Sequence, residues 1–181
     1  MMPLFEFGES VPGLPYKTVD ERVMRGSAGI MLVLAAIAMV NGFVLQNYIA
    51  VTTVSAFLMG NFLIGVGVNL RFAPTIIAAK WMVQGQTPIP IGAVQKRFAW
   101  FLGLALSTAI FSLSLLLLGD ASWFQKVCGL CLGCIALLYL ETVFGICVGC
   151  KLYPLAIWLK LIPEPKVRPN CMGDSCDVKP S

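Results

Sequence analysis

The sequence predicts an all-α polytopic membrane protein with four transmembrane helices and short interfacial helices. Hydrophobic residues fill 58% of its 181 positions and charged residues only 12%, with a mean hydropathy of +0.84. Soluble domains average about 25% charged residues. The apolar residues form long uninterrupted blocks, as membrane-spanning helices do. Charges flank these blocks and form no basic face, so we expect a lipid bilayer and no nucleic acid as partner.

The first two spans come from an uncharged stretch of 45 residues, 26–70. This stretch is too long for one span of about 20 residues and suits two spans joined by a short turn. We predict helices over residues 27–45 and 49–70, with the turn at Gln46 and Asn47. Neither helix has a charged side chain to bury.

The third and fourth spans are predicted over residues 98–118 and 127–150, and a Gly-Asp pair separates them. Between the second and third spans, residues 75–83 form a short amphipathic segment that predicts an interfacial helix. Residues 153–162 have the same character, with a Trp and a Lys that suit the headgroup region. The connections are therefore short except for the one between the second and third spans.

These spans predict three parts: an N-terminal arm (1–25), a four-helix membrane domain (26–162) and a flexible tail (163–181). An even number of spans puts both termini on one side of the membrane. Twelve of the thirteen Lys and Arg residues fall on that side, and only Lys126 falls on the other. Because cytoplasmic segments are enriched in Lys and Arg, both termini are predicted to be cytoplasmic. The arm lacks the apolar core of a secretory signal, so we expect the first span to be retained.

Small and polar residues within the spans predict how the helices pack. Gly103, Ser107 and Ser114 share one face of the third span, and such stripes let helix backbones approach closely. Asn61 and Asn69 in the second span are expected to hydrogen-bond between helices. Gly-x-x-x-Gly pairs in the fourth span favour packing, including association of copies of the chain. These pairs are Gly129 with Gly133 and Gly145 with Gly149.

Seven cysteines and no histidine dominate the chemistry of the chain. Five of them lie in the fourth predicted span, where the unit Cys-[Leu/Val]-Gly-Cys occurs twice. A spacing of three residues places thiols one turn apart, so either a disulfide or a shared soft metal ion is geometrically feasible. The candidate metal ligands are Cys128, Cys131, Cys134, Cys147 and Cys150, and the candidate catalytic residues are Cys131, Cys134, Cys147, Cys150 and Glu141. The tail adds Cys171 and Cys176.

The two groups of cysteines are expected to differ in reactivity. The outer triplet, Cys128, Cys131 and Cys134, begins the predicted helix, where the positive end of the helix dipole and Lys126 favour thiolates. The inner pair, Cys147 with Cys150, is predicted at the negative end of the same helix. We therefore expect the outer thiols to be the more reactive set.

Glu141 is an ionisable residue near the middle of the fourth predicted span. Such a residue costs about 2.5–3.5 kcal/mol on the insertion scale, and it marks a functional site by default. Helical projection places it on the same stripe as Cys134. The structural alternative is a protonated Glu141 that hydrogen-bonds to Asn61 or Asn69.

Three motifs resemble those of a bacterial four-span membrane family that is catalogued only as a domain of unknown function. They are Val-Asp-Glu-Arg-Val (19–23), Lys-Arg-Phe-Ala-Trp (96–100) followed by Gly103, and Cys-Val-Gly-Cys-Lys-Leu-Tyr (147–153). The resemblance covers residues 17–155. It implies the four-span architecture, the bacterial inner membrane and a site at the inner pair, and it implies no activity.

We first interpret the chain as a membrane thiol protein that carries a sulfur species or a thiophilic metal ion across the inner membrane. Cys sulfur suits such cargo because it is a soft ligand and a nucleophile, and a sulfur-transfer or thioredoxin-like protein would be the partner. One alternative is a disulfide oxidoreductase in which Cys131 and Cys134 cycle. Another is a non-catalytic assembly subunit whose cysteines only pack. No sequence feature identifies a quinone pocket or another cofactor.

Overall fold

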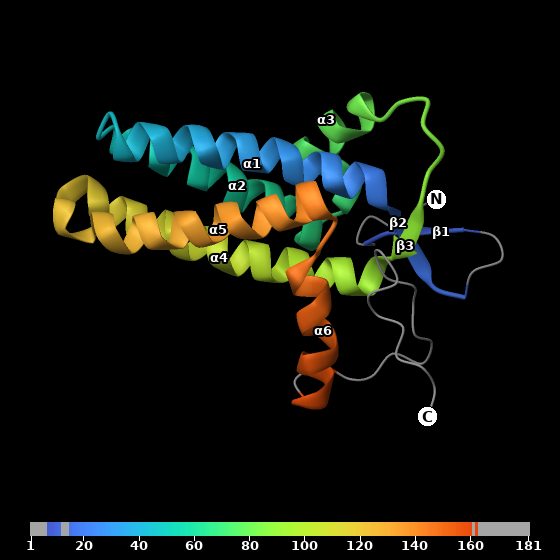
Figure 1. The fold of residues 1–181 in the computed structure, drawn as a ribbon. Helices are drawn as coiled ribbons and strands as arrows, with labels where there is room; N and C mark the ends of the chain where they lie inside the picture. The colour runs from blue at the N-terminus through green and yellow to red at the C-terminus, as the bar shows by residue number, and fades with distance from the viewer. Residues whose placement is uncertain (1–6, 12–14, 161, 163–181) are drawn as a thin grey trace.

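The computed structural model describes residues 7–11, 15–160 and 162. Four long helices run side by side (Figure 1), each long and apolar enough to cross a membrane. They are α1 (Glu21–Phe43), α2 (Tyr48–Gly67), α4 (Ala93–Gly119) and α5 (Phe124–Phe144). The predicted number of spans is thus confirmed, and the chain is a multi-pass protein of the all-α class. The predicted tail, with Cys171 and Cys176, lies outside the described residues.

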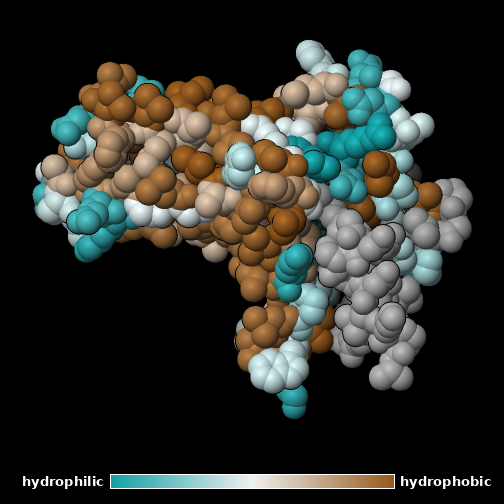
Figure 2. All heavy atoms as spheres, in the orientation of Figure 1, coloured by the Kyte–Doolittle hydropathy of each residue, from teal (hydrophilic) through white to brown (hydrophobic). Residues whose placement is uncertain are grey.

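The outer surface of the bundle is apolar, as contact with lipid requires. Apolar side chains cover most of the length of the spans, while hydrophilic residues gather at the two ends (Figure 2). Val33, Ile37 and Val40 of α1, for example, are each at least half exposed. Such a surface is stable only where lipid rather than water surrounds it.

Short side chains cap the ends of the spans. The Asp20 carboxylate accepts hydrogen bonds from the backbone N–H groups of Arg22 (3.0 Å) and Ile89 (3.2 Å) and so begins α1. Asn47 caps α2, and Gln46 before it has a φ of 51°, which confirms the turn predicted at these two residues. Between α4 and α5, hydrogen bonds from the side chain and the backbone of Ser122 lower the pKa of the exposed Asp120 carboxyl.

A small antiparallel sheet, which the sequence analysis did not predict, closes one end of the bundle. Its strands are β1 (Glu9–Ser10), β2 (Lys17–Asp20) and β3 (Pro90–Gly92), in the order β1-β2-β3. Thr18 of β2 pairs with Glu9 on one side and Gly92 on the other. Because β2 leads into α1 and β3 leads into α4, the sheet fixes the starts of two spans relative to each other.

The predicted helix contacts are formed largely as expected. A Cβ at Gly103 would lie 2.6 Å from the Phe62 ring, so this glycine permits the close approach of α2 and α4. Ser107 and Ser114 are buried on the same face of α4, and the hydroxyl of Ser114 lies 3.4 Å from that of Ser55 in α2. The small-residue stripe is therefore a packing surface.

Asn61 forms the predicted hydrogen bonds between helices, whereas Asn69 caps a short 3-10 helix, η1 (Leu70–Phe72). The Asn61 side chain accepts from the backbone N–H and the hydroxyl of Thr75, both at 3.0 Å. Thr75 is near the start of α3 (Pro74–Met82), the helix predicted over residues 75–83. Its hydroxyl lies 2.7 Å from that of Ser27 in α1, so one polar chain joins three helices.

The prediction of one helix from residue 127 to 150 is wrong. Helix α5 ends at Phe144 because Gly145 adopts the left-handed conformation, with a φ of 68°. The backbone N–H of Ile146 then donates to the carbonyl of Leu140 at 3.0 Å, which closes the helix end. A separate helix, α6 (Val148–Trp158), turns away from the direction of the bundle (Figure 1).

This break also changes the meaning of the glycine pairs. Gly145 and Gly149 lie in different structural elements, so they do not form the predicted helix-face motif. Gly129 and Gly133 are on one stretch of α5, and a Cβ at either would meet no atom within 4 Å. That surface is open in the single chain, and association through it stays a prediction.

Candidate functional site

The inner pair is joined as a disulfide at the start of α6. The Cα atoms of Cys147 and Cys150 are 5.2 Å apart. Cys147 is the N-cap residue of the helix, and the backbone N–H of Cys150 donates to its Sγ at 3.3 Å. The pair was predicted at a negative helix end, and this is wrong because α5 stops before it. Its sulfur atoms lie instead at the positive end of a new helix, where thiolates are stabilised.

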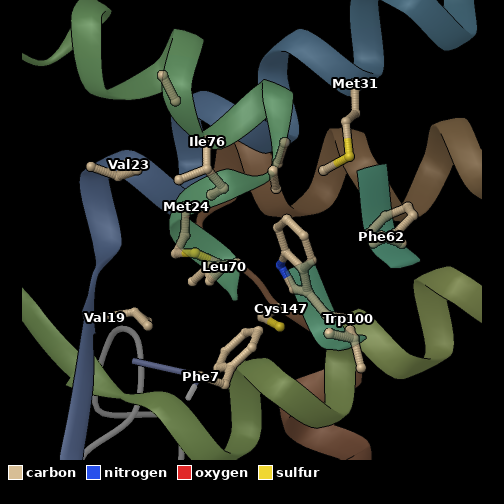
Figure 3. Packing of buried hydrophobic residues seen from close by; sticks show 14 of the residues in the cluster. Phe7, Val19, Val23, Met24, Met31, Phe62, Leu70, Ile76, Trp100 and Cys147 are labelled. Carbon is tan, nitrogen blue, oxygen red and sulfur yellow. The ribbon is translucent and has the colours of Figure 1, made fainter. Parts of the chain in front are cut away.

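Aromatic side chains cover the disulfide. Cys147 and Cys150 are only 4% and 6% exposed, and they belong to the buried cluster that contains Phe7 and Trp100 (Figure 3). The Phe7 and Trp100 rings meet edge to face with centroids 6.2 Å apart. Trp100 also lies against Gly65 of α2, where a Cβ would come within 2.2 Å of the indole. The pair is therefore shielded by the N-terminal segment and by α4.

Gly149, the third residue of the Cys-Val-Gly-Cys motif, brings α6 against α4. A Cβ at Gly149 would lie 2.7 Å from Cβ and 2.8 Å from Cα of Ala99. One turn later the Tyr153 ring packs on Phe98 with centroids 5.7 Å apart. Burial raises the pKa of the Tyr153 hydroxyl, so this side chain stays neutral beside the pair. The glycine thus sets how closely the disulfide approaches the bundle.

We expect Gly149→Ala to destabilise the protein by about 1–3 kcal/mol, because the new methyl group overlaps the backbone of α4. Thermal unfolding in detergent measures the effect. Gly133→Ala is the matched control, since its Cβ meets open space. The control should be neutral or stabilising by up to about 1 kcal/mol. Equal unfolding temperatures for the two variants would show that the close contact is not needed.

Glu141 has a partner that the sequence analysis did not identify. Its carboxylate forms an ion pair with the ammonium of Lys96, whose side chain is 1% exposed, while that of Glu141 is 20% exposed. The predicted bonds from Glu141 to Asn61 or Asn69 are absent among the hydrogen bonds of the described chain, since those amides bind elsewhere. Glu141 is also in the last turn of α5 rather than mid-span, because the helix ends three residues later.

The ion pair lies at the end of the bundle that carries the disulfide. Lys96 is in the first turn of α4, three residues before the Ala99 contact of α6. Lys96 lies at the positive end of α4 and Glu141 at the negative end of α5, so each charge alone is unfavourable to its own helix dipole. The attraction between the two charges offsets this cost. Arg25 lies nearby and donates to the free carbonyls of Thr142 and Val143 at 3.1 and 3.3 Å. The ion pair therefore links α4 to α5, and the Arg25 hydrogen bonds link α1 to the end of α5.

The outer triplet is at the opposite end of α5, with all three thiols free. The helix begins at Phe124, so Cys128 is already beyond the first turn, and Lys126 lies over the Trp123 ring at 4.1 Å. The helix dipole therefore does not favour thiolates at the outer triplet, as the sequence analysis had assumed. Cys131 and Cys134 border a partly open apolar cavity of about 30 Å³. Within the described ranges, no three His, Cys, Asp or Glu side chains converge to hold a metal ion.

The sequence analysis identified the inner cysteine pair but placed it at the wrong helix end. The signal that would have placed the inner pair is the glycine two residues before Cys147, because glycine commonly ends helices in the left-handed conformation. A helix break there moves the Cys-x-x-Cys unit to a helix start. For Lys96 the sequence offered no comparable signal, since it reads as a flanking charge of the third span.

A family described as Domain of unknown function (DUF4395) matches residues 19–157 of the chain. The match includes all four spans, the ion pair and the disulfide. No curated protein and no solved structure matches the chain.

Proposed function

The chain belongs to this family of unknown function, and from the geometry at the start of α6 we propose that it is a membrane thiol–disulfide oxidoreductase. The redox pair is Cys147 with Cys150, in place of the Cys131 and Cys134 pair first considered. The observation that carries the proposal is a Cys-x-x-Cys disulfide at a helix N-terminus, with a backbone N–H directed at the first sulfur. This setting stabilises the thiolate that performs exchange.

A purely structural role explains the disulfide less well. The bond closes a loop of four residues, and in the chain-entropy model such a loop contributes about 2 kcal/mol, against about 4.7 for a loop of 100 residues. The excess of Lys and Arg also favours the cytoplasmic side for α6. Disulfides in that compartment are usually transient and catalytic or redox-sensing.

The reaction is reversible thiol–disulfide exchange with a thioredoxin-like protein. In the reduced chain the Cys147 thiolate attacks the disulfide of the partner, so a mixed disulfide forms and one partner thiolate leaves. The Cys150 thiolate then attacks the Cys147 sulfur, releases the second partner thiolate and re-forms the intramolecular disulfide. Two electrons and two protons pass to the partner. The reverse sequence of steps reduces the disulfide of the chain. Because both sulfur atoms are buried, exchange in either direction requires the Phe7 and Trp100 side chains to move away from them.

The carrier interpretation has less support from the geometry. Cys134 and the end of α5 are ten residues apart, which is about 15 Å of helix. Leu138 and the Lys96–Glu141 pair occupy the intervening region. A relay between the outer triplet and the inner pair would have to cross this gap without an intermediate thiol on α5. Transfer of sulfur or metal between the two groups stays a prediction.

Trapping of the mixed disulfide tests the proposal. Inverted membrane vesicles that contain the reduced Cys150→Ser variant are mixed with a purified, oxidised thioredoxin-class protein. We expect a covalent adduct on a non-reducing gel, because Cys147 attacks and no Cys150 resolves the product. Cys147→Ser should abolish the adduct. The predicted orientation requires the adduct to be absent from right-side-out vesicles.

Cys128→Ser in the Cys150→Ser background is the matched control, since it removes a thiol at the other end of α5. It should leave the adduct unchanged. Equal trapping by Cys147→Ser and Cys150→Ser would contradict the assigned roles. Trapping that depends on Cys128 would move the redox function to the outer triplet.

A further inference from the structure

Sulfur atoms from two different spans meet at the end of the bundle opposite α6. The Sγ of Cys128 in α5 lies 4.0 Å from the Sδ of Met39 in α1. The two residues are 89 positions apart, so no sequence motif links them. Cys128 is a free thiol. This contact takes no part in the chemistry proposed for the inner pair.

Met39 and Cys128 line a small, partly open cavity that Cys131 also borders. The cavity lies between the spans and has a volume of about 10 Å³, which is about the room that one water molecule needs. Apolar side chains such as Val51 and Leu117 form the rest of its wall. On the other side, Met39 and Cys128 border a surface groove of about 330 Å³.

We propose that Cys128 and Met39 form a binding site for one Cu(I) ion. With metal–sulfur bonds of about 2.3 Å, two sulfurs 4.0 Å apart subtend an angle of about 120° at the ion. That is the angle between two ligands of a trigonal set, and Cys131, one turn further along α5, borders the same cavity.

The donor chemistry selects Cu(I) over other ions. Thiolate and thioether sulfurs are soft ligands, which favour Cu(I), whereas Ca²⁺ and Mg²⁺ require oxygen ligands. Binding breaks the S–H bond of Cys128, releases the proton to water and forms a copper–thiolate bond. One thiolate neutralises the single charge of the ion, and the thioether adds none. The complex is thus uncharged, as an apolar cavity requires.

Competition with a chromophoric Cu(I) chelator tests the site. The full chain carries Cys171→Ser and Cys176→Ser, and ascorbate keeps copper reduced while the Cys147–Cys150 disulfide stays intact. We expect one Cu(I) per chain and an X-ray absorption spectrum with sulfur neighbours only. Met39→Leu should weaken binding by at least about 10- to 100-fold, the cost of losing even an outer-shell partner. Cys128→Ser should abolish it.

Two matched controls isolate the cluster. Met82→Leu removes an exposed thioether on α3, and Cys134→Ser removes the thiol that borders the other cavity. Both should bind copper as the parent chain does. If the parent chain binds no Cu(I), or if Met39→Leu binds as tightly as Met82→Leu, the proposal is wrong. This result is independent of thiol trapping by Cys147, because the inner pair remains oxidised throughout.

Discussion

Glu141→Gln is expected to lower the free energy of unfolding by about 3–5 kcal/mol, the usual cost of removing one partner from a buried ion pair. The reason is that the Lys96 ammonium, 1% exposed, then has no countercharge. Lys96→Met should be similarly damaging, because the Glu141 carboxylate is left in an apolar setting. Unfolding by titration with a denaturing detergent measures each loss.

The double variant Lys96→Met/Glu141→Gln should recover most of the stability, since it leaves neither charge unpaired. Losses that simply add in the double variant would mean that the two charges do not interact. The exposed pair of Lys80 with Glu9, at 3.9 Å, provides the control. Because both of its side chains are in contact with solvent, Lys80→Met should cost less than about 1 kcal/mol.

The four spans were predictable because a bilayer imposes a length and a composition that a sequence displays directly. The turn at Gln46 and Asn47 and the packing of Gly103 and Ser114 followed from local patterns on single helices. In each case neighbouring residues carry the signal. Hydropathy alone, however, does not distinguish one long helix from two helices joined at Gly145, because both halves are apolar.

The parts that were missed depend on contacts between distant segments. Lys96 and Glu141 are 45 positions apart. In the sequence Lys96 resembles an ordinary charge flanking a span, and Glu141 resembles a carboxyl group that is costly to bury. Only the fold shows that they form a pair. The sheet has strands of two to four residues, too short for an alternating pattern to appear. Tertiary packing, rather than local propensity, forms these features.

Trp100→Ala is expected to cost about 3–5 kcal/mol of stability, because truncating a buried aromatic residue leaves a cavity. Trp100 is 4% exposed, and it contacts Phe62 edge to face with centroids 5.2 Å apart. Gly65 provides the space that the indole fills, and an alanine at position 100 would leave that space empty. Thermal unfolding in detergent measures the loss.

The same substitution should expose the redox pair. Phe7 packs on Trp100, and both belong to the cluster that buries Cys147, so the cover loosens when the indole is removed. We expect a water-soluble phosphine to reduce the disulfide of Trp100→Ala faster than that of the parent chain. Trp158→Ala is the control, because Trp158 on α6 is 76% exposed and buries nothing comparable. If both variants are reduced at the parent rate, burial by Trp100 does not limit access to Cys147. Other side chains than Phe7 and Trp100 would then have to shield the disulfide.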